Sequence, residues 1–219
     1  MATTKRHFDV IVVGVGGMGS ATTYHLAQRG ARVLGLEQFG IPHELGSSHG
    51  QTRIIRQAYY EHPSYVPLLL RAYELWQELE TAVDEQLLFI TGILNIGASG
   101  TFNFEGAWRS AQDHDLPHEV LSADEVNRRY PACRLPEEMR ALYEPLGGFL
   151  PPERCVVAHV EQAMAAGAEV HGHEAVTDWQ PDGDGVRVTT TRDTYSADRL
   201  VLTAGAWVGR MLADLRLPL

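Results

Sequence analysis

The amino-terminal part of the sequence switches from a strand pattern to a helix pattern and back. Residues 8–13, FDVIVV, form a continuous apolar and β-branched run typical of a strand buried on both faces. Glycines follow at once, residues 18–29 have a helical pattern, and Gly30 stands where a left-handed helix cap belongs. Residues 32–36, RVLGL, predict a second short buried strand. The pattern indicates a βαβ unit in roughly 30 residues.

The next stretch predicts a long loop, a helix and a strand. Residues 38–63 contain glycine, proline, serine and histidine without a clear period, which indicates a functional loop. Residues 64–80 predict a helix with one apolar side, and Pro67 falls in its first turn, where its missing N–H is tolerated. Residues 87–96 predict a strand.

Two further helices have recognisable ends. Ser122 and Glu125 form a capping-box signature for a short helix, and Pro131 ends it. Residues 153–166 predict a longer helix that Gly167 terminates. These helices alternate with strands, so the fold class is α/β.

The last third of the chain changes to short strands. They are expected at 169–170, 175–179, 185–190 and 199–203, with PDGDG at 181–185 as the turn between two of them. This pattern predicts a β-meander that returns to the main sheet. The sequence then stops at RLPL, residues 216–219, without the closing helix and strands that a finished α/β domain normally shows. Part of the fold is therefore expected to be missing.

Composition favours a globular protein that binds small molecules. Of the 219 residues, 44% are hydrophobic and 21% charged, and the net charge of −10 argues against nucleic acid or an anionic membrane as a partner. No stretch approaches the ~20 apolar residues that span a bilayer, and no signal peptide is recognisable. The two cysteines, Cys133 and Cys155, suggest buried thiols in a reducing compartment and no metal site. We expect a cytoplasmic protein.

A glycine motif directly follows the first predicted strand and opens the first predicted helix. It is a GxGxxG sequence of six residues: Gly14, Val15, Gly16, Gly17, Met18 and Gly19. The first glycine permits a tight turn, the second lets the backbone approach a pyrophosphate, and the third lets the helix pack closely on the strand. The helix N-terminus adds N–H donors and partial positive charge. In this context the motif predicts a dinucleotide site.

An acidic residue completes this fingerprint. Glu37 closes the second strand at the distance from Gly14 expected for a carboxylate that accepts from a ribose hydroxyl. Its charge disfavours the 2′-phosphate of NADP. NAD and FAD both remain compatible with the fingerprint.

A longer stretch of sequence resembles one family of flavoproteins. The similar segments are GSSHGQTRIIR (46–56), LEQFGIPH (36–43), YVPLLLRAYELWQELE (65–80), TGILNIG (91–97) and TAGAW (203–207). They resemble the family of monomeric sarcosine oxidase, peroxisomal sarcosine/pipecolate oxidase and N-methyltryptophan oxidase over nearly the whole chain. The resemblance implies a p-hydroxybenzoate-hydroxylase-like, Rossmann-type fold and FAD as cofactor. It also implies oxidation of a secondary amino acid at its CH–NH bond by transfer to flavin N5, with O2 as oxidant and H2O2 as product.

The resemblance also implies a domain plan. The FAD-binding domain would consist of residues 1–85 and 148–219, around a partial substrate domain at 86–147, and the carboxy-terminal half of the family's fold would be absent. The family's flavin-tethering cysteine lies in that half. We therefore expect the isolated chain neither to hold FAD covalently nor to turn over an amine.

Individual positions take roles from the same resemblance. Arg53 matches an arginine against the isoalloxazine ring, Arg56 one that pairs with the substrate carboxylate, and His49 a histidine near the flavin. Ser48 departs from the His-His pair of the bacterial enzymes and agrees with the Ser-Ser-His form of the peroxisomal branch. The remaining matched positions contact the cofactor: Gln38, Ser47, Ser48, Thr52, Ile54, Val176 (through its backbone, to adenine), Gly205 and Trp207.

Several alternatives stay open at the level of sequence. A guanidinium can bind a carboxylate through two parallel hydrogen bonds, but Arg53 and Arg56 could also be solvated or structural ion pairs. His171 and His173 alternate on a predicted strand, yet two histidines without a third ligand are usually surface residues. The whole protein could be an NAD-dependent oxidoreductase instead. It could also be a noncatalytic FAD-binding fragment or one subunit of a split oxidase with a complementary chain.

Overall fold

The computed structural model describes residues 6–212, which form two compact units. Among the described residues, one unit consists of residues 6–52 and 151–212, and the other of residues 53–150. The units divide after residues 52 and 150, whereas the domain boundaries expected from the sequence lie after residues 85 and 147. The expected domain plan remains a prediction. Residues 216–219, after which part of the fold is expected to be missing, lie outside the described residues.

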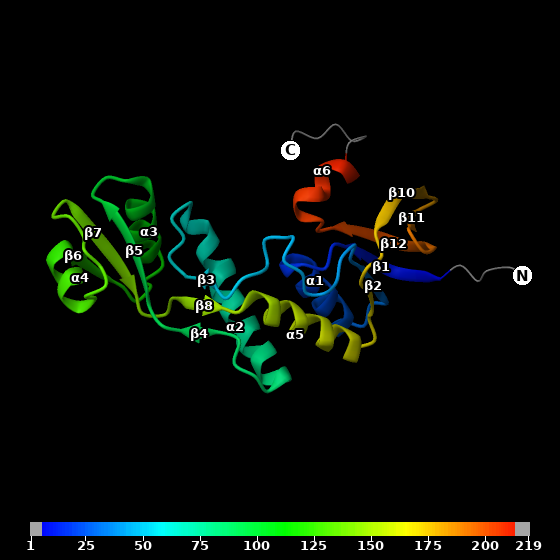
Figure 1. Cartoon of the computed structure of the whole chain (residues 1–219), viewed down its shortest axis with the longest axis horizontal. Coiled ribbons are helices and arrows are strands. Elements are labelled where there is room, and N and C mark those ends of the chain that lie inside the picture. The colour runs from blue at the N-terminus through cyan, green and yellow to red at the C-terminus, as the bar shows by residue number, and fades with distance from the viewer. Residues whose placement is uncertain (1–5, 213–219) are drawn as a thin grey trace, which may run out of the picture. The chain divides into compact units, whose positions relative to one another are not determined.

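The first unit is built on a sheet of six strands in the order β10-β11-β12-β1-β2-β9 (Figure 1). Its strands are β1 (His7–Val13), β2 (Val33–Leu36), β9 (Glu169–His171), β10 (Val176–Asp182), β11 (Gly185–Thr190) and β12 (Thr194–Leu202). Strands β12, β1, β2 and β9 pair in parallel, whereas β10, β11 and β12 form an antiparallel meander. The predicted βαβ unit and the returning meander are confirmed.

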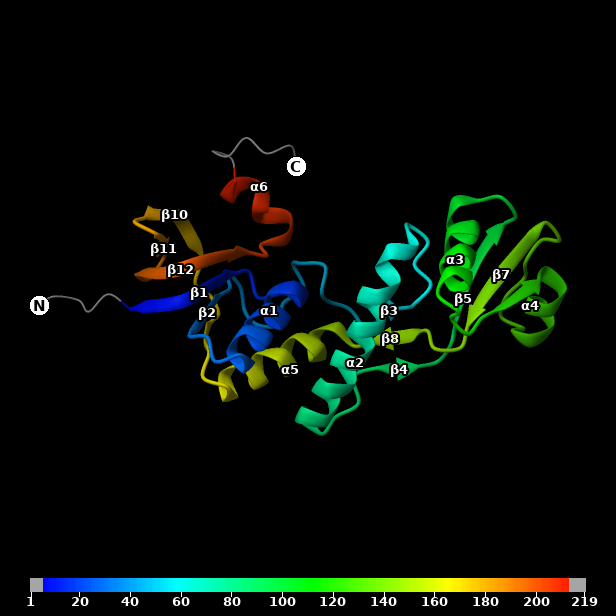
Figure 2. The same ribbon diagram turned by 180° about the vertical axis from the view of Figure 1, so that it is seen from behind.

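Two long helices of this unit pack against each other, and both views show them side by side (Figures 1 and 2). They are α1 (Gly17–Gln28) and α5 (Pro152–Ala165). Gly30 and Gly167 follow them with φ of 83° and 94°, so both expected glycine terminators adopt the left-handed backbone that glycine tolerates. A short turn η2 (Gly205–Trp207) and helix α6 (Val208–Met211) follow β12.

The core of the first unit lies between β1, β2 and the meander. Ile11 and Leu34 are fully buried there, and Val188 and Ala197 pack into the same cluster. The uninterrupted apolar run of β1 is explained by this position, because β1 has a strand on each side and is covered on both faces. The sequence placed the last strand at 199–203, but β12 begins at Thr194, since residues 194–197 pair with β11 and residues 196–202 pair with β1.

The second unit contains two small sheets. One has the order β3-β8-β4, with β3 (Arg53–Ile55), β8 (Gly148–Leu150) and β4 (Phe89–Ile90). The other has the order β5-β7-β6, with β5 (Ile93–Ala98), β7 (Met139–Glu144) and β6 (Glu119–Ser122). The single strand expected at 87–96 is wrong: Gly92, with φ of 75°, divides it into β4 and β5 of different sheets.

The helices of the second unit are η1 (Pro63–Tyr65), α2 (Val66–Val83), α3 (Phe102–Asp113) and α4 (Ala123–Arg129). Helix α2 confirms the expected helix and extends three residues past its predicted end at residue 80. The capping box of Ser122 and Glu125 is present at α4. Phe104 and Ala107 of α3 are fully buried against Leu142. The sequence missed α3, and β3 lies within the expected loop 38–63.

No helix among residues 6–212 is both long enough and apolar enough to cross a membrane.

Cys155 is buried as expected, whereas Cys133 is only partly buried. Neither cysteine forms a disulfide.

Candidate functional site

The turn between β1 and α1 allows the backbone to pack without side chains. Gly14 has φ of 91°, and a Cβ added there would lie 2.6 Å from the carbonyl oxygen of Thr203. A Cβ on Gly19 would collide with the carbonyl oxygen of Gly14. The Thr203 hydroxyl donates to that same oxygen at 2.7 Å and to the carbonyl of Val13 at 3.1 Å. Glycine is therefore required at both positions, and Thr203 links the turn to the end of β12.

Gly16 is different, because a Cβ added there would have space around it. The nearest atom to an added Cβ would be Ser48 Oγ at 3.9 Å. Gly16 is the N-cap residue of α1, and the next N–H, that of Gly17, donates to Ser48 Oγ at 3.0 Å. An open backbone at a helix N-terminus is the arrangement that receives a phosphate. Met18, in the first turn of α1, is 77% exposed.

Glu37 lies directly after β2 and is only 5% exposed. One carboxylate oxygen accepts from the Val15 N–H at 2.9 Å and the other from the Phe39 N–H at 3.0 Å. These two bonds fix the carboxylate beside the β1–α1 turn. Since a carboxylate has about four acceptor sites, Glu37 retains capacity for a ligand hydroxyl.

A cavity at the carboxyl ends of β1 and β2 brings together seven of the residues predicted from the sequence. They are Gly14, Gly16, Glu37, Gln38, Val176, Gly205 and Trp207. The carboxyl ends of parallel strands are where doubly wound folds bind their ligands. The residues of this cavity fit the ADP part of a dinucleotide, because they combine an open helix N-terminus with an acceptor for ribose hydroxyls.

The remaining predicted positions of the first unit are Val15, Gly17, Met18 and Gly19 of the turn, and Ser47, Ser48, His49 and Thr52 of the loop after β2. That loop has no helix or strand between residues 38 and 52, and its Gly50 N–H donates to Glu153 Oε1 at 2.7 Å. Ser48 reaches the turn through Gly17. A flavin contact for the loop residues remains a prediction.

Sequence reasoning missed four residues that line the cavity with side-chain functional groups: His43, Glu174, Thr203 and Arg210. They lie far along the sequence from the GxGxxG motif, and no local sequence pattern identifies them. His43 and Thr203 are exceptions in one respect, because they lie inside the LEQFGIPH and TAGAW segments that carry the resemblance.

Glu174 is a buried carboxylate with donors on several sides. Thr190 Oγ1 and the Tyr195 hydroxyl donate to one of its oxygens at 2.7 and 2.9 Å, and His171 Nδ1 lies 3.0 Å from the other. Burial opposes ionisation, but these partners hold the pKa of Glu174 below its ordinary value. Burial and the neighbouring carboxylate raise the pKa of Tyr195 to about 12. His171 therefore has a carboxylate partner, whereas His173 is exposed.

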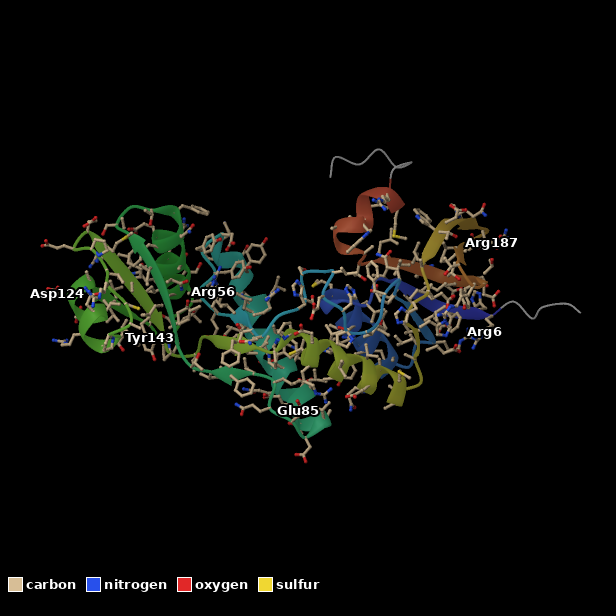
Figure 3. All side chains as sticks on the ribbon, in the orientation of Figure 1. Arg6, Arg56, Glu85, Asp124, Tyr143 and Arg187 are labelled. Atoms are coloured by element: carbon tan, nitrogen blue, oxygen red, sulfur yellow. The ribbon has the colours of Figure 1, made fainter. Side chains whose placement is uncertain are left out.

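The second unit holds the two arginines of the sequence motif. Arg53 and Ile54 lie on β3, where both side chains are exposed. Arg56, which follows β3, is labelled in Figure 3. Its guanidinium carbon lies 4.9 Å from the ring centroids of both Tyr59 and Tyr60. Such cation–π contacts fix a guanidinium without using its N–H donors. Arg56 Nε is buried and has no hydrogen-bond partner among the described residues.

Glu144 stabilises the segment that follows Arg56. Its Oε2 accepts from the N–H groups of Gln57 at 3.2 Å and Ala58 at 2.7 Å, and its Oε1 accepts from the Asn95 amide at 2.6 Å. Burial raises the pKa of Glu144, against the opposing effect of these donors and of the Arg56 charge. No sequence pattern pointed to Glu144.

Known proteins are similar to this chain over nearly all of its length. Monomeric sarcosine oxidase from Streptomyces avermitilis is 49% identical over 96% of the chain, and that from Bacillus sp. strain B-0618 is 43% identical over 96%. The alignments include 55% and 54% of those proteins, so the chain spans about half the length of the curated relatives it matches.

Solved structures give the same result for the fold. A Tyr258Phe mutant of NikD, described as an unusual amino acid oxidase essential for nikkomycin biosynthesis, has a TM-score of 0.86 and 33% identity, over 96% of this chain and 54% of that one. Glycine oxidase from Geobacillus kaustophilus has a TM-score of 0.80 and 26% identity, over 98% of this chain and 60% of that one.

The family comparison decides between the two cofactors that the glycine fingerprint left open. The model of FAD dependent oxidoreductases matches residues 9–219, so the cofactor is FAD, and the NAD-dependent alternative has no support. The resemblance seen in the sequence segments is thereby confirmed. The chain belongs to the family of FAD dependent oxidoreductases.

Proposed function

We propose that this chain carries the ADP-binding part of the FAD site in an oxidase that acts on the CH–NH bond of a secondary amino acid. Sarcosine, another N-methyl amino acid or pipecolate would be the substrate, and O2 the oxidant. The 49% identity to a monomeric sarcosine oxidase is the observation that carries this proposal. The cavity of the first unit supports its cofactor half.

The residues predicted to bind FAD would contact different parts of the cofactor. The open backbone at Gly16 and the N-terminus of α1 accommodate the pyrophosphate. Glu37 accepts ribose hydroxyls, and the backbone of Val176 contacts adenine. Gln38, Gly205 and Trp207 also line the cavity that would hold the ADP part. Ser47, Ser48, Thr52 and Ile54 continue along the pyrophosphate and flavin.

In the substrate half, Arg56 binds the amino-acid carboxylate through its N–H groups while Tyr59 and Tyr60 hold the guanidinium. Arg53 and His49 lie near the flavin, and a cation there favours the electron-rich reduced ring. Bound FAD supplies the redox chemistry by accepting the electrons of the CH–NH bond and passing them to O2. We further propose a cytoplasmic location and the two-segment domain plan of the sequence analysis.

A second candidate is a noncatalytic or split FAD-binding subunit that needs a complementary chain. The two candidates share the cofactor site and differ in turnover. Peroxide release with sarcosine and pipecolate, measured for the purified chain and for the longest open reading frame that contains it, separates them.

The cofactor site is tested by Glu37→Ala, with the exposed Glu44→Ala of the same loop as control. Loss of a charge-assisted hydrogen bond weakens binding by roughly tenfold to a hundredfold. FAD titration followed by fluorescence quenching should show that loss for Glu37→Ala and no change for Glu44→Ala. Equal affinities for both variants would remove Glu37 from the site.

The substrate site is tested in a complete, active enzyme. Arg56→Ala should raise KM for amino acids and abolish their preference over the matching decarboxylated amines, whereas Arg53→Ala should chiefly slow flavin reduction. Wild-type kinetics in both variants would contradict the assigned roles.

A further inference from the structure

His43 lies on the loop after β2 and lines the same cavity as Glu37. Its side chain is only 18% exposed. Its ring meets Phe39 edge-on at 5.0 Å between centroids, and Phe39 in turn meets Trp207 edge-on at 5.5 Å. A Cβ on Gly46 would lie 3.4 Å from His43 Cε1. The imidazole is therefore held on several sides.

The hydrogen bonds around His43 determine which ring nitrogen carries its proton. The Leu45 N–H donates to Nδ1 at 3.1 Å, and a backbone N–H can only donate. Nδ1 must therefore present its lone pair, and the proton of the neutral ring lies on Nε2. The local turn thus fixes both the ring and its tautomer.

The protonated nitrogen faces the ribose-binding carboxylate. His43 Nε2 lies 3.6 Å from Glu37 Oε1, the oxygen that also accepts from the Phe39 N–H. At this separation the contact is electrostatic and longer than an ordinary hydrogen bond. Low exposure of both partners strengthens it, because little water screens the charge.

We propose that His43 is a positioning residue of the nucleotide site, which orients the Glu37 carboxylate toward the ribose 2′-hydroxyl by presenting Nε2–H to Oε1. The inference rests on the proposed function, because it assumes that Glu37 receives the ribose. It adds a residue that the glycine fingerprint does not contain. The Val15 and Phe39 N–H groups each donate to one of the two carboxylate oxygens, and His43 Nε2 adds a second polar neighbour to Oε1.

The proposal is tested with a pair of substitutions that separate the two ring nitrogens. In His43→Asn the side-chain oxygen can still accept from the Leu45 N–H, but nothing reaches Glu37. In His43→Gln the amide N–H extends to the position of Nε2, and the acceptor for Leu45 is lost. A residue that acts through Glu37 should tolerate glutamine better than asparagine, whereas a residue that only stabilises the loop should show the reverse.

The ligands are ADP and 2′-deoxy-ADP, titrated calorimetrically into the wild-type chain and both variants. We expect His43→Asn to lose roughly threefold to tenfold in affinity for ADP and to bind 2′-deoxy-ADP like the wild type. His43→Gln should retain most of the ADP affinity. In a Glu37→Gln background the His43→Asn substitution should have no further effect, because its action passes through the carboxylate.

The outcomes distinguish this inference from the proposed function. A wild-type chain that binds ADP and 2′-deoxy-ADP equally would overturn the ribose role of Glu37 and the proposed site with it. A wild-type preference for ADP that survives in His43→Asn, or additive losses in the double variant, would overturn the role of His43 alone. Equal losses for both nucleotides together with a lowered thermal midpoint would mean that His43 only supports the loop, which also contradicts the proposal.

Discussion

Glu37 of the first unit and Glu144 of the second are both buried carboxylates, 5% and 2% exposed. Each accepts two backbone N–H groups. Their remaining surroundings differ. Glu37 lines a cavity, whereas Glu144 also accepts the Asn95 amide and lies beneath the segment that follows Arg56.

Under the proposed role of Glu37 at the ribose, the difference teaches how to distinguish a carboxylate that binds a ligand from one that stabilises a fold. Depth of burial does not separate them, since both are almost fully enclosed. The remaining surroundings do: Glu37 accepts from two backbone N–H groups and lines a cavity, whereas Glu144 accepts from three protein donors and does not line that cavity. The same criterion separates Gly16, with space beside it, from Gly14 and Gly19, which are packed against backbone.

The largest expected effect contrasts two glycines of the first unit. A Cβ on Gly19 would collide with Gly14 and lie 2.7 Å from Thr203 Oγ1, so Gly19→Ala should lower the free energy of unfolding by about 3 kcal/mol. Gly16→Ala, whose Cβ has free space, should leave stability unchanged and lose FAD affinity. Urea denaturation and FAD titration measure the two quantities. Equal destabilisation by both substitutions would break the distinction between packed and open glycines.

The second effect concerns Glu144. Glu144→Ala leaves two buried N–H groups and the Asn95 amide without their acceptor, and should lower the free energy of unfolding by about 3 kcal/mol or somewhat less. Affinity for ADP should not change, because every residue that lines the cavity belongs to the first unit. Glu119→Ala, at the exposed ion pair with Arg129, is the control and should have little effect. A change in ADP affinity would contradict the separation of roles.

The smallest effect is a dependence of stability on pH in the first unit. Burial between α1 and α5 lowers the pKa of His159 to about 4, from the ordinary 6.5. The unfolded chain therefore binds the proton first, so stability is complete above about pH 6.5 and is lost as the pH falls toward 4. Between pH 7 and pH 5 the loss should be about 2 kcal/mol.

Denaturation at the two pH values measures this loss. His159→Phe should remove it, and His62→Asn, at an exposed histidine of the second unit, should not. Glu144 acts in the opposite sense: its raised pKa makes its contribution largest below the unfolded value and smaller as the pH rises. A pH dependence that survives in His159→Phe would show that another group is responsible.

The sequence predicted seven of the residues that line the cavity of the first unit, and none of the partners of Glu144 in the second. Glu37 could be found because it closes the second strand of a local βαβ unit, and Gly14, Gly16 and Gly19 because their spacing reflects one turn. Glu144 could not be found, because its backbone partners lie 87 and 86 residues away in the sequence. Thr203 reaches Gly14 across 189 residues.

Taken alone, the sequence determined the first strand, the helix, the second strand and the places where only glycine fits, because these depend on periodicity and on steric contacts between near neighbours. It also determined the family, through segments spread along the chain. Tertiary structure alone decided that residues 87–96 divide between two sheets, that Glu174 is enclosed by Thr190 and Tyr195, and that His43 faces Glu37. Those outcomes depend on packing between segments that the local pattern does not connect.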